Sequence, residues 1–157
     1  FTSGRAMFAH GNTWSGHPLS TSIGLSVLDI IERDGVIENV KANEPESGAL
    51  LDDMRDLPFV GDVRGCGHFW ALEVVKDKAT AEAFSQDEAN WMLRDALSGQ
   101  MASRGLLCRL DDRDQPVIQL SPPPIADMDT ISPMPGILKE ALIHVHGQVR
   151  NGEAPWV

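Results

Sequence analysis

The stretch FAHGNTWSGHP at residues 8–18 combines glycine, hydroxyl and histidine side chains and ends in a proline. Without sustained hydrophobic periodicity, it is typical of a loop. Pro18 suits the first turn of a helix, because its φ is already helical and its missing N–H would have no partner there. A loop entering a helix N-terminus could bind a phosphate through hydroxyl and N–H groups. Ordinary loops have the same composition, so the residues alone leave this open.

Two helices are expected directly after this loop. Apolar residues recur with helical spacing as far as Ile31, and Gly35 marks the end of the first helix. The second helix is expected to begin near Val36. Proline lacks the N–H that a helix interior needs, so Pro45 is expected to interrupt this helix and Pro58 to stop it.

The middle of the chain changes to strand-like sequence. Residues 59–75 are rich in β-branched residues and glycine, which predicts two strands or one bent strand with a glycine bulge. The sequence SQDE at residues 85–88 is a capping box, and it opens a helix that is expected to end near Gly105. Residues 106–110 and 116–120 then predict a hairpin around a polar turn.

The last helix is expected from about Asp127 to His146, with a frayed tail from Gly147. Pro133 and Pro135 are expected to break or delay its start. The order is therefore helix, helix, strand, strand, helix, strand, strand, helix. This order predicts an α+β fold in which a small, mostly antiparallel sheet is covered by helices on one side.

Composition narrows the class of protein. The chain has 157 residues, 42% of them hydrophobic, which is enough for a core in one domain of ordinary size. The net charge of −10 argues against a nucleic-acid partner. No apolar run approaches the roughly 18 residues of a membrane-spanning helix, so no membrane partner is expected. Cys66 and Cys108 form no CxxC pair and are expected to be buried free thiols, as in a reducing cytoplasm.

The histidines do not predict a metal site. His10 and His17 flank the first loop without a cysteine or acid at ligand spacing. His144 and His146 are two residues apart on a predicted helix, whereas a zinc pair on a helix is spaced four apart. No metal is therefore expected.

Arg109 lies on a predicted strand ahead of an acidic turn. It could form a surface salt bridge with Asp111, Asp112 or Asp114. It could equally face a pocket and bind a carboxylate through both arms of its guanidinium. Local sequence leaves both interpretations open. The acidic residues of the turn are expected to be solvated.

The stretch at residues 8–18 resembles a signature of the class III, or omega-type, aminotransferases, which are pyridoxal-phosphate enzymes of fold type I. The resemblance covers about residues 1–145 and looks most like the pyruvate-dependent omega-amino-acid and amine transaminases. It continues in register through LDIIERDG at 28–35, VGDVRGCG at 60–67, EVVKDK at 73–78, RGLLCR at 104–109 and LSPP at 120–123.

The resemblance implies roles for individual residues. Thr13 would give its hydroxyl and backbone N–H to the cofactor phosphate in the neighbouring subunit's site, which implies a homodimer or higher homo-oligomer. Asn12 would lie beside that phosphate, at a position that is often aromatic in the family. Arg109 matches the mobile arginine that pairs with the substrate carboxylate and swings aside for amines. Trp14, the next residue of the signature, is assigned with Arg109 to the binding of small amine and keto-acid substrates.

The resemblance also implies that a catalytic residue lies outside this chain. The family's Schiff-base lysine precedes the signature, and none of the four lysines here matches it, namely Lys41, Lys76, Lys78 and Lys139. A transaminase needs that amine. We therefore expect a C-terminal fragment that is inactive alone.

The expected parts of this fragment are the end of the large cofactor-binding domain (1–35), the small domain (36–147) and a tail (148–157). The parent would move an amino group from an amine or omega-amino acid to a keto acid such as pyruvate. One alternative is a racemase, aminomutase or decarboxylase of the same family. The other is a non-catalytic α+β module for binding or dimerisation.

Overall fold

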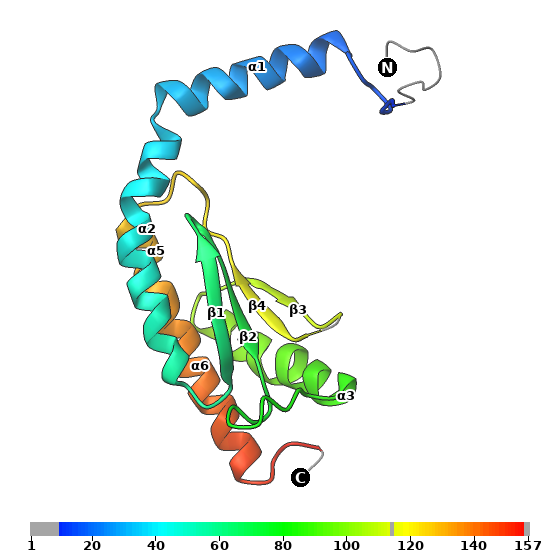
Figure 1. Ribbon diagram of the computed structural model, residues 1–157, viewed down its shortest axis with the longest axis vertical. Helices are drawn as coiled ribbons and strands as arrows, with labels where there is room; N and C mark the ends of the chain where they lie inside the picture. The colour runs from blue at the N-terminus through cyan, green and yellow to red at the C-terminus, as the bar shows by residue number, and fades with distance from the viewer. Residues whose placement is uncertain (1–9, 114, 156–157) are drawn as a thin grey trace, which may run out of the picture. The chain divides into compact units, whose positions relative to one another are not determined.

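The computed structural model of the chain describes residues 10–113 and 115–155. The described residues form two compact units, which divide between Val36 and Ile37. The elements, coloured along the chain in Figure 1, are α1 (Pro18–Arg33), α2 (Val36–Asp52), η1 (Asp53–Asp56), β1 (Val60–Cys66), β2 (Phe69–Val74), α3 (Gln86–Asn90), η2 (Trp91–Leu97), α4 (Ser98–Ser103), β3 (Arg109–Asp111), β4 (Val117–Leu120), α5 (Met128–Ile131) and α6 (Pro133–Arg150).

The first unit consists mainly of α1. The helix begins at Pro18, as the sequence predicts, and none of its residues is buried. It ends where Gly35 adopts a φ of +61°, a conformation that glycine reaches without strain. Its apolar side chains are exposed, among them Leu19, Ile23, Leu25, Val27, Leu28 and Ile30.

The second unit is built on one four-stranded antiparallel sheet in the order β1-β2-β4-β3. It consists of two hairpins joined by the pairing of β2 with β4. The β1–β2 ladder closes at the pair Cys66 and Phe69, and the turn between them needs Gly67, whose φ is +57°. At Gly65 the Trp70 ring lies so close that an added Cβ would come within 2.5 Å of it. The prediction of two strands here is confirmed.

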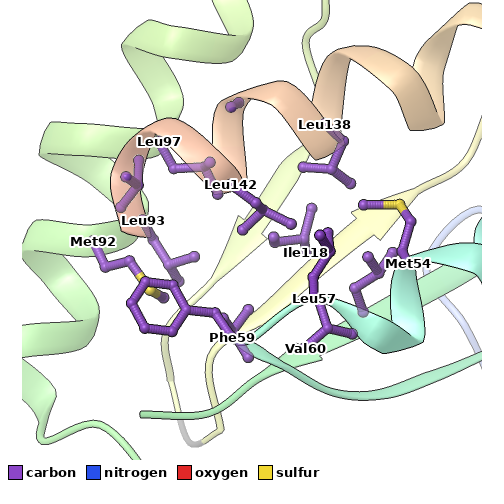
Figure 2. Packing of buried hydrophobic residues seen from close by; sticks show 14 of the residues in the cluster. Met54, Leu57, Phe59, Val60, Met92, Leu93, Leu97, Ile118, Leu138 and Leu142 are labelled. Carbon is purple, nitrogen blue, oxygen red and sulfur yellow. The ribbon is translucent and has the colours of Figure 1, made fainter. Parts of the chain in front are cut away.

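One face of this sheet is covered by helices, and the other carries charged side chains such as Arg64 and Glu73 together with the exposed ring of Phe69. Leu72, Ile118 and Leu120 point into the core, which also takes in side chains of α6 and of the helical stretch from α3 to α4. Figure 2 shows Leu138 and Leu142 of α6 directed toward Ile118 of β4. The structure therefore confirms the predicted α+β fold with a small antiparallel sheet covered on one side.

Helix α2 corrects the prediction that Pro45 interrupts it. The helix runs unbroken from Val36 to Asp52 with Pro45 inside. Its side chains hold it to the segment after β4, because Asn39 Nδ2 donates to the carbonyl oxygens of Pro124 and Ala126, each at 2.9 Å. Ser47, Gly48 and Leu51 are buried farther along the helix. These tertiary contacts offset the one backbone hydrogen bond that the proline removes.

The start of the last helix is broken at the prolines, as predicted, but its end differs from the prediction. A short α5 precedes α6, and α6 begins at Pro133 itself, in the first turn where proline removes no helical hydrogen bond. Pro135 is buried within the same turn. The helix continues to Arg150, beyond the predicted end at His146, because Val145 lies in the core and Val149 packs against it.

The predicted helix after Ser85 is present but contains a π-helical segment. Residues Trp91–Leu97 are π-helical between α3 and α4. Such wide turns are rare and change which side chains face a neighbour. Here Met92, Leu93 and Leu97 are buried while Arg94 stays at the surface.

The predicted capping box at Ser85 is confirmed, and it gives a first testable expectation. Ser85 Oγ accepts from the Glu88 N–H at 3.4 Å, and Glu88 Oε2 accepts from the Ser85 N–H at 2.7 Å. Ser85→Ala should lower the free energy of unfolding by about 1 kcal/mol, measured by urea titration of the chain. Ser98→Ala, at an exposed position of α4, is the control and should change it by less than about 0.5 kcal/mol. Equal shifts for both variants would show that the cap does not contribute.

Candidate functional site

The candidate phosphate-binding residues lie in one turn before α1. The Asn12 carbonyl oxygen accepts from the Ser15 N–H at 3.0 Å, and that of Trp14 accepts from the His17 N–H at 3.1 Å. Trp14 has a φ of 68°, which a large side chain rarely adopts. Its ring lies edge-on to that of His17, with the ring centroids 4.9 Å apart. Residues 8 and 9 of the signature lie outside the described part of the chain.

This turn has the features of an anion site. It leads into the N-terminus of a 16-residue helix whose first turn contains no acidic residue. Unpaired N–H groups and the helix dipole make such a terminus attractive to negative charge. Asn12 and Thr13 are both exposed there. The Thr13 hydroxyl is therefore accessible at this helix N-terminus.

Arg109 lies in the second unit, at the start of β3. Its cross-strand partner is Gln119 of β4, and 59% of its side chain is exposed. Arg109 and Gln119 both line a pocket of about 150 Å³. Leu106, Leu107, Cys108, Leu120, Ser121, Pro122, Pro123 and Met134 complete it. Arg109 thus lines a small pocket with both polar and apolar walls, where its guanidinium can receive a carboxylate.

The structure shows the salt bridge that the sequence offered as one interpretation of Arg109. Its Nη2 donates to Oδ2 of Asp111 at 3.2 Å, so the residue lines a pocket and also forms a salt bridge. Asp111 in turn accepts two hydrogen bonds from the side chain of Arg113, one of them from Nε at 2.9 Å. These bonds hold the pKa of Asp111 well below its usual range. Asp114, the third candidate partner, lies outside the described residues.

The burial of Asp112 differs from what the sequence predicts. Asp112 is buried, although the acidic turn was expected to be solvated. Arg94 binds it through both arms, with Nε to Oδ2 at 2.7 Å and Nη2 to Oδ1 at 2.8 Å, and this lowers the pKa of Asp112. Gln86 donates to the Asp112 carbonyl oxygen at 2.9 Å. The end of β3 is therefore fastened to the helical stretch behind it.

The lysines do not form a site with Arg109. Lys76 Nζ contacts Glu88 Oε1 at 2.8 Å, and this hydrogen bond raises the pKa of Lys76, the opposite of what a nucleophilic amine needs. Lys78 donates to the carbonyl oxygen of Arg55. Lys41 and Lys139 lie on α2 and α6. None of the four lines the Arg109 pocket.

The cysteines only partly follow the prediction. Both are free, but Cys66 is exposed at the end of β1 and is not buried. Cys108 is half-buried, and burial raises the pKa of its thiol to about 11. Within the described ranges, no group of three or more histidine, cysteine or acidic side chains could hold a metal ion. In the same ranges, no helix is long and apolar enough to cross a membrane.

Comparison with known proteins identifies the family. A family model described as aminotransferase class-III matches residues 1–142. The chain belongs to the class-III aminotransferase family. It is 44% identical over 142 residues to a Mycobacterium tuberculosis protein named "Probable aminotransferase Rv3329". That match covers 90% of this chain and 30% of the relative.

Solved structures of aminotransferases share the fold. The omega-transferase of Vibrio fluvialis JS17 superposes with a TM-score of 0.78 at 33% identity, covering 92% of this chain and 33% of that one. An omega-aminotransferase from Paracoccus denitrificans gives 0.75 at 35% identity, covering 94% and 32%. This aminotransferase chain therefore spans about a third of the length of these relatives.

Proposed function

We propose that this chain supplies the C-terminal part of a pyridoxal-phosphate aminotransferase, which moves an amino group from an amine or omega-amino acid to a keto acid such as pyruvate. The observation that carries the proposal is Arg109 at its small pocket, since every keto acid presents a carboxylate. A relative from Pseudomonas aeruginosa named putrescine–pyruvate aminotransferase supports it, with 37% identity over 89 residues, 56% of this chain and 20% of that protein.

Arg109 binds the substrate in this proposal. Its guanidinium stays charged at every working pH and matches both oxygens of a carboxylate. The residue is more than half exposed and has one salt-bridge partner at 3.2 Å. It can therefore turn toward a keto acid and away from an amine that lacks a carboxylate. Trp14 is also assigned to substrate binding, because it belongs to the signature at residues 8–18.

Thr13 and Asn12 hold the cofactor in this proposal, at its phosphate end. Pyridoxal phosphate supplies the electron sink that lets an amino group leave one carbon and join another. A structure of the Vibrio fluvialis aminotransferase is described as PMP-bound, and one of its mutant as PLP-bound. Because Thr13 is assigned to a neighbouring subunit's site, the working form is a homodimer or larger homo-oligomer. We place it in the cytoplasm.

The chain alone is proposed to be inactive. Its four lysines lie on helices or make the contacts described above, and Lys76 is held as a cation by Glu88. The amine that carries the cofactor therefore comes from residues outside this chain. Such residues correspond to the remaining two thirds of the relatives' length.

The deciding experiment uses the full-length protein that contains this chain. With an amine, pyruvate and pyridoxal phosphate, we expect alanine to form with loss of nitrogen from the amine. A product that keeps its nitrogen would show a racemase, aminomutase or decarboxylase instead. Failure to bind the cofactor at all would favour a binding or dimerisation module.

Thr13→Ala should weaken binding of pyridoxal phosphate by about 10- to 100-fold, because a hydrogen bond to a charged group contributes about 1.5–3 kcal/mol. The dissociation constant is measured by absorbance titration of the full-length apoprotein. Ser15→Ala removes a hydroxyl from the same turn and serves as the control, with little expected change. If both variants bind like the wild type, Thr13 does not hold the phosphate.

A further inference from the structure

The strand that carries Arg109 also carries an internal carboxylate within its reach. Arg109 and Asp111 are two residues apart on β3, so their side chains lie on the same face of the sheet. Only 14% of the Asp111 side chain is exposed, against 59% for Arg109. The carboxylate is therefore held in place while the guanidinium beside it is largely in solvent.

Asp111 is shared unequally between two arginines. Arg113 binds both of its oxygens, through Nε at 2.9 Å and through Nη2. Arg109 reaches only Oδ2, at 3.2 Å. A carboxylate has about four acceptor positions. Arg113 uses three of them on Asp111, through its Nε, its Nη2 and its backbone N–H. Arg109 is thus the weakly held partner, and an incoming carboxylate that offers two oxygens competes well for it.

We propose that Asp111 competes with a substrate carboxylate for the guanidinium of Arg109, and that Arg113 weakens this competition by binding Asp111 itself. This inference rests on the proposed function, in which Arg109 binds the keto acid. It makes Asp111 and Arg113 positioning residues that set the balance between substrates with and without a carboxylate. Neither residue lines the 150 Å³ pocket that contains Arg109.

A structural role predicts something different for the same residues. Asp111 Oδ1 also accepts from the Arg113 N–H at 3.2 Å, which stabilises the turn after β3. Asp111→Asn keeps this acceptor and removes the charge. Arg113→Ala keeps the donating backbone N–H. If Asp111 served only the turn, neither Asp111→Asn nor Arg113→Ala would change substrate binding.

The test measures the dissociation constant of propionate, a carboxylate that cannot react, for the full-length holoenzyme. Asp111→Asn should tighten propionate binding by about 2- to 5-fold, the range expected for a partly exposed ion pair. Arg113→Ala should weaken it by a similar factor, because Asp111 then binds Arg109 with both oxygens. KM for pyruvate should follow the same directions with kcat little changed.

The Arg109→Ala background separates this mechanism from a general effect of charge. In an enzyme that carries Arg109→Ala, Asp111→Asn and Arg113→Ala should no longer alter propionate binding. A general electrostatic effect of these two charges on propionate would persist in that enzyme. With an amine and an uncharged aldehyde, Asp111→Asn should lower kcat/KM by about 2- to 5-fold, and adding Arg109→Ala should restore it. Persistent effects, or equal directions for the two single variants, would overturn the inference.

The two proposals fail in different ways. If the wild type transfers no amino group, or if Arg109→Ala leaves propionate binding unchanged, the proposed function is wrong. If Arg109→Ala weakens propionate binding while Asp111→Asn and Arg113→Ala do nothing, only the inference about Asp111 is wrong.

Discussion

Arg109→Ala should raise KM for pyruvate by about 10- to 100-fold in the full-length enzyme and leave activity between an amine and an aldehyde that both lack a carboxylate within about 2-fold. The lost contact is a charged hydrogen-bonded pair between a guanidinium and a carboxylate, which contributes about 1.5–3 kcal/mol. The amine and aldehyde without a carboxylate make no such contact with Arg109. The measurement is steady-state kinetics with both substrate pairs at one ionic strength.

Two further variants test whether this effect depends on the guanidinium of Arg109. Arg109→Lys keeps the charge and loses the planar fork, so its KM for pyruvate should fall between those of wild type and Arg109→Ala. Arg150→Ala removes an exposed arginine at the end of α6 and should behave like the wild type. An equal loss for both substrate pairs in Arg109→Ala would mean that Arg109 supports the fold and does not bind the carboxylate.

Leu138→Ala should lower the free energy of unfolding of the chain by about 2–5 kcal/mol. Leu138 is fully buried in the core between α6 and the sheet, and the truncation removes apolar contacts and leaves a cavity. A loss of this size is a large part of the stability of an ordinary domain. Urea unfolding followed by tryptophan fluorescence should show a midpoint lower by about 1–2 M.

Ile143→Ala is the matched control for this variant. It lies on the same helix and is 52% exposed, so its truncation should cost less than about 1 kcal/mol. Similar losses at the two positions would show that α6 is not held to the sheet by the face that carries Leu138.

The elements that could be predicted from sequence are those with local signals. The capping box at Ser85, the start of α1 at Pro18 and the glycine turn after β1 depend on residues a few positions apart, and all three are present. The continuity of α2 through Pro45 could not be predicted in this way. It depends on contacts of Asn39 with carbonyl groups more than 80 residues away.

The residues of the candidate site also differ in whether a local sequence pattern predicts them. Arg109 was found because a whole motif surrounds it, and the structure adds the pocket that it lines. Arg94 was missed because its partner Asp112 lies 18 residues away and no local pattern joins a helical arginine to a buried aspartate. The π-helical segment that contains Arg94 also has no simple sequence signal.

The order of the strands has a consequence for how the second unit assembles. Both hairpins pair strands that follow each other directly in the chain, so each can close a short loop at small cost in chain entropy before the other exists. Covering the apolar face of the sheet comes later, because Leu138, Leu142 and Val145 all come from α6. During synthesis the sheet can therefore form early, but the part of its apolar face that α6 covers stays open to water, and to other chains, until α6 has been made.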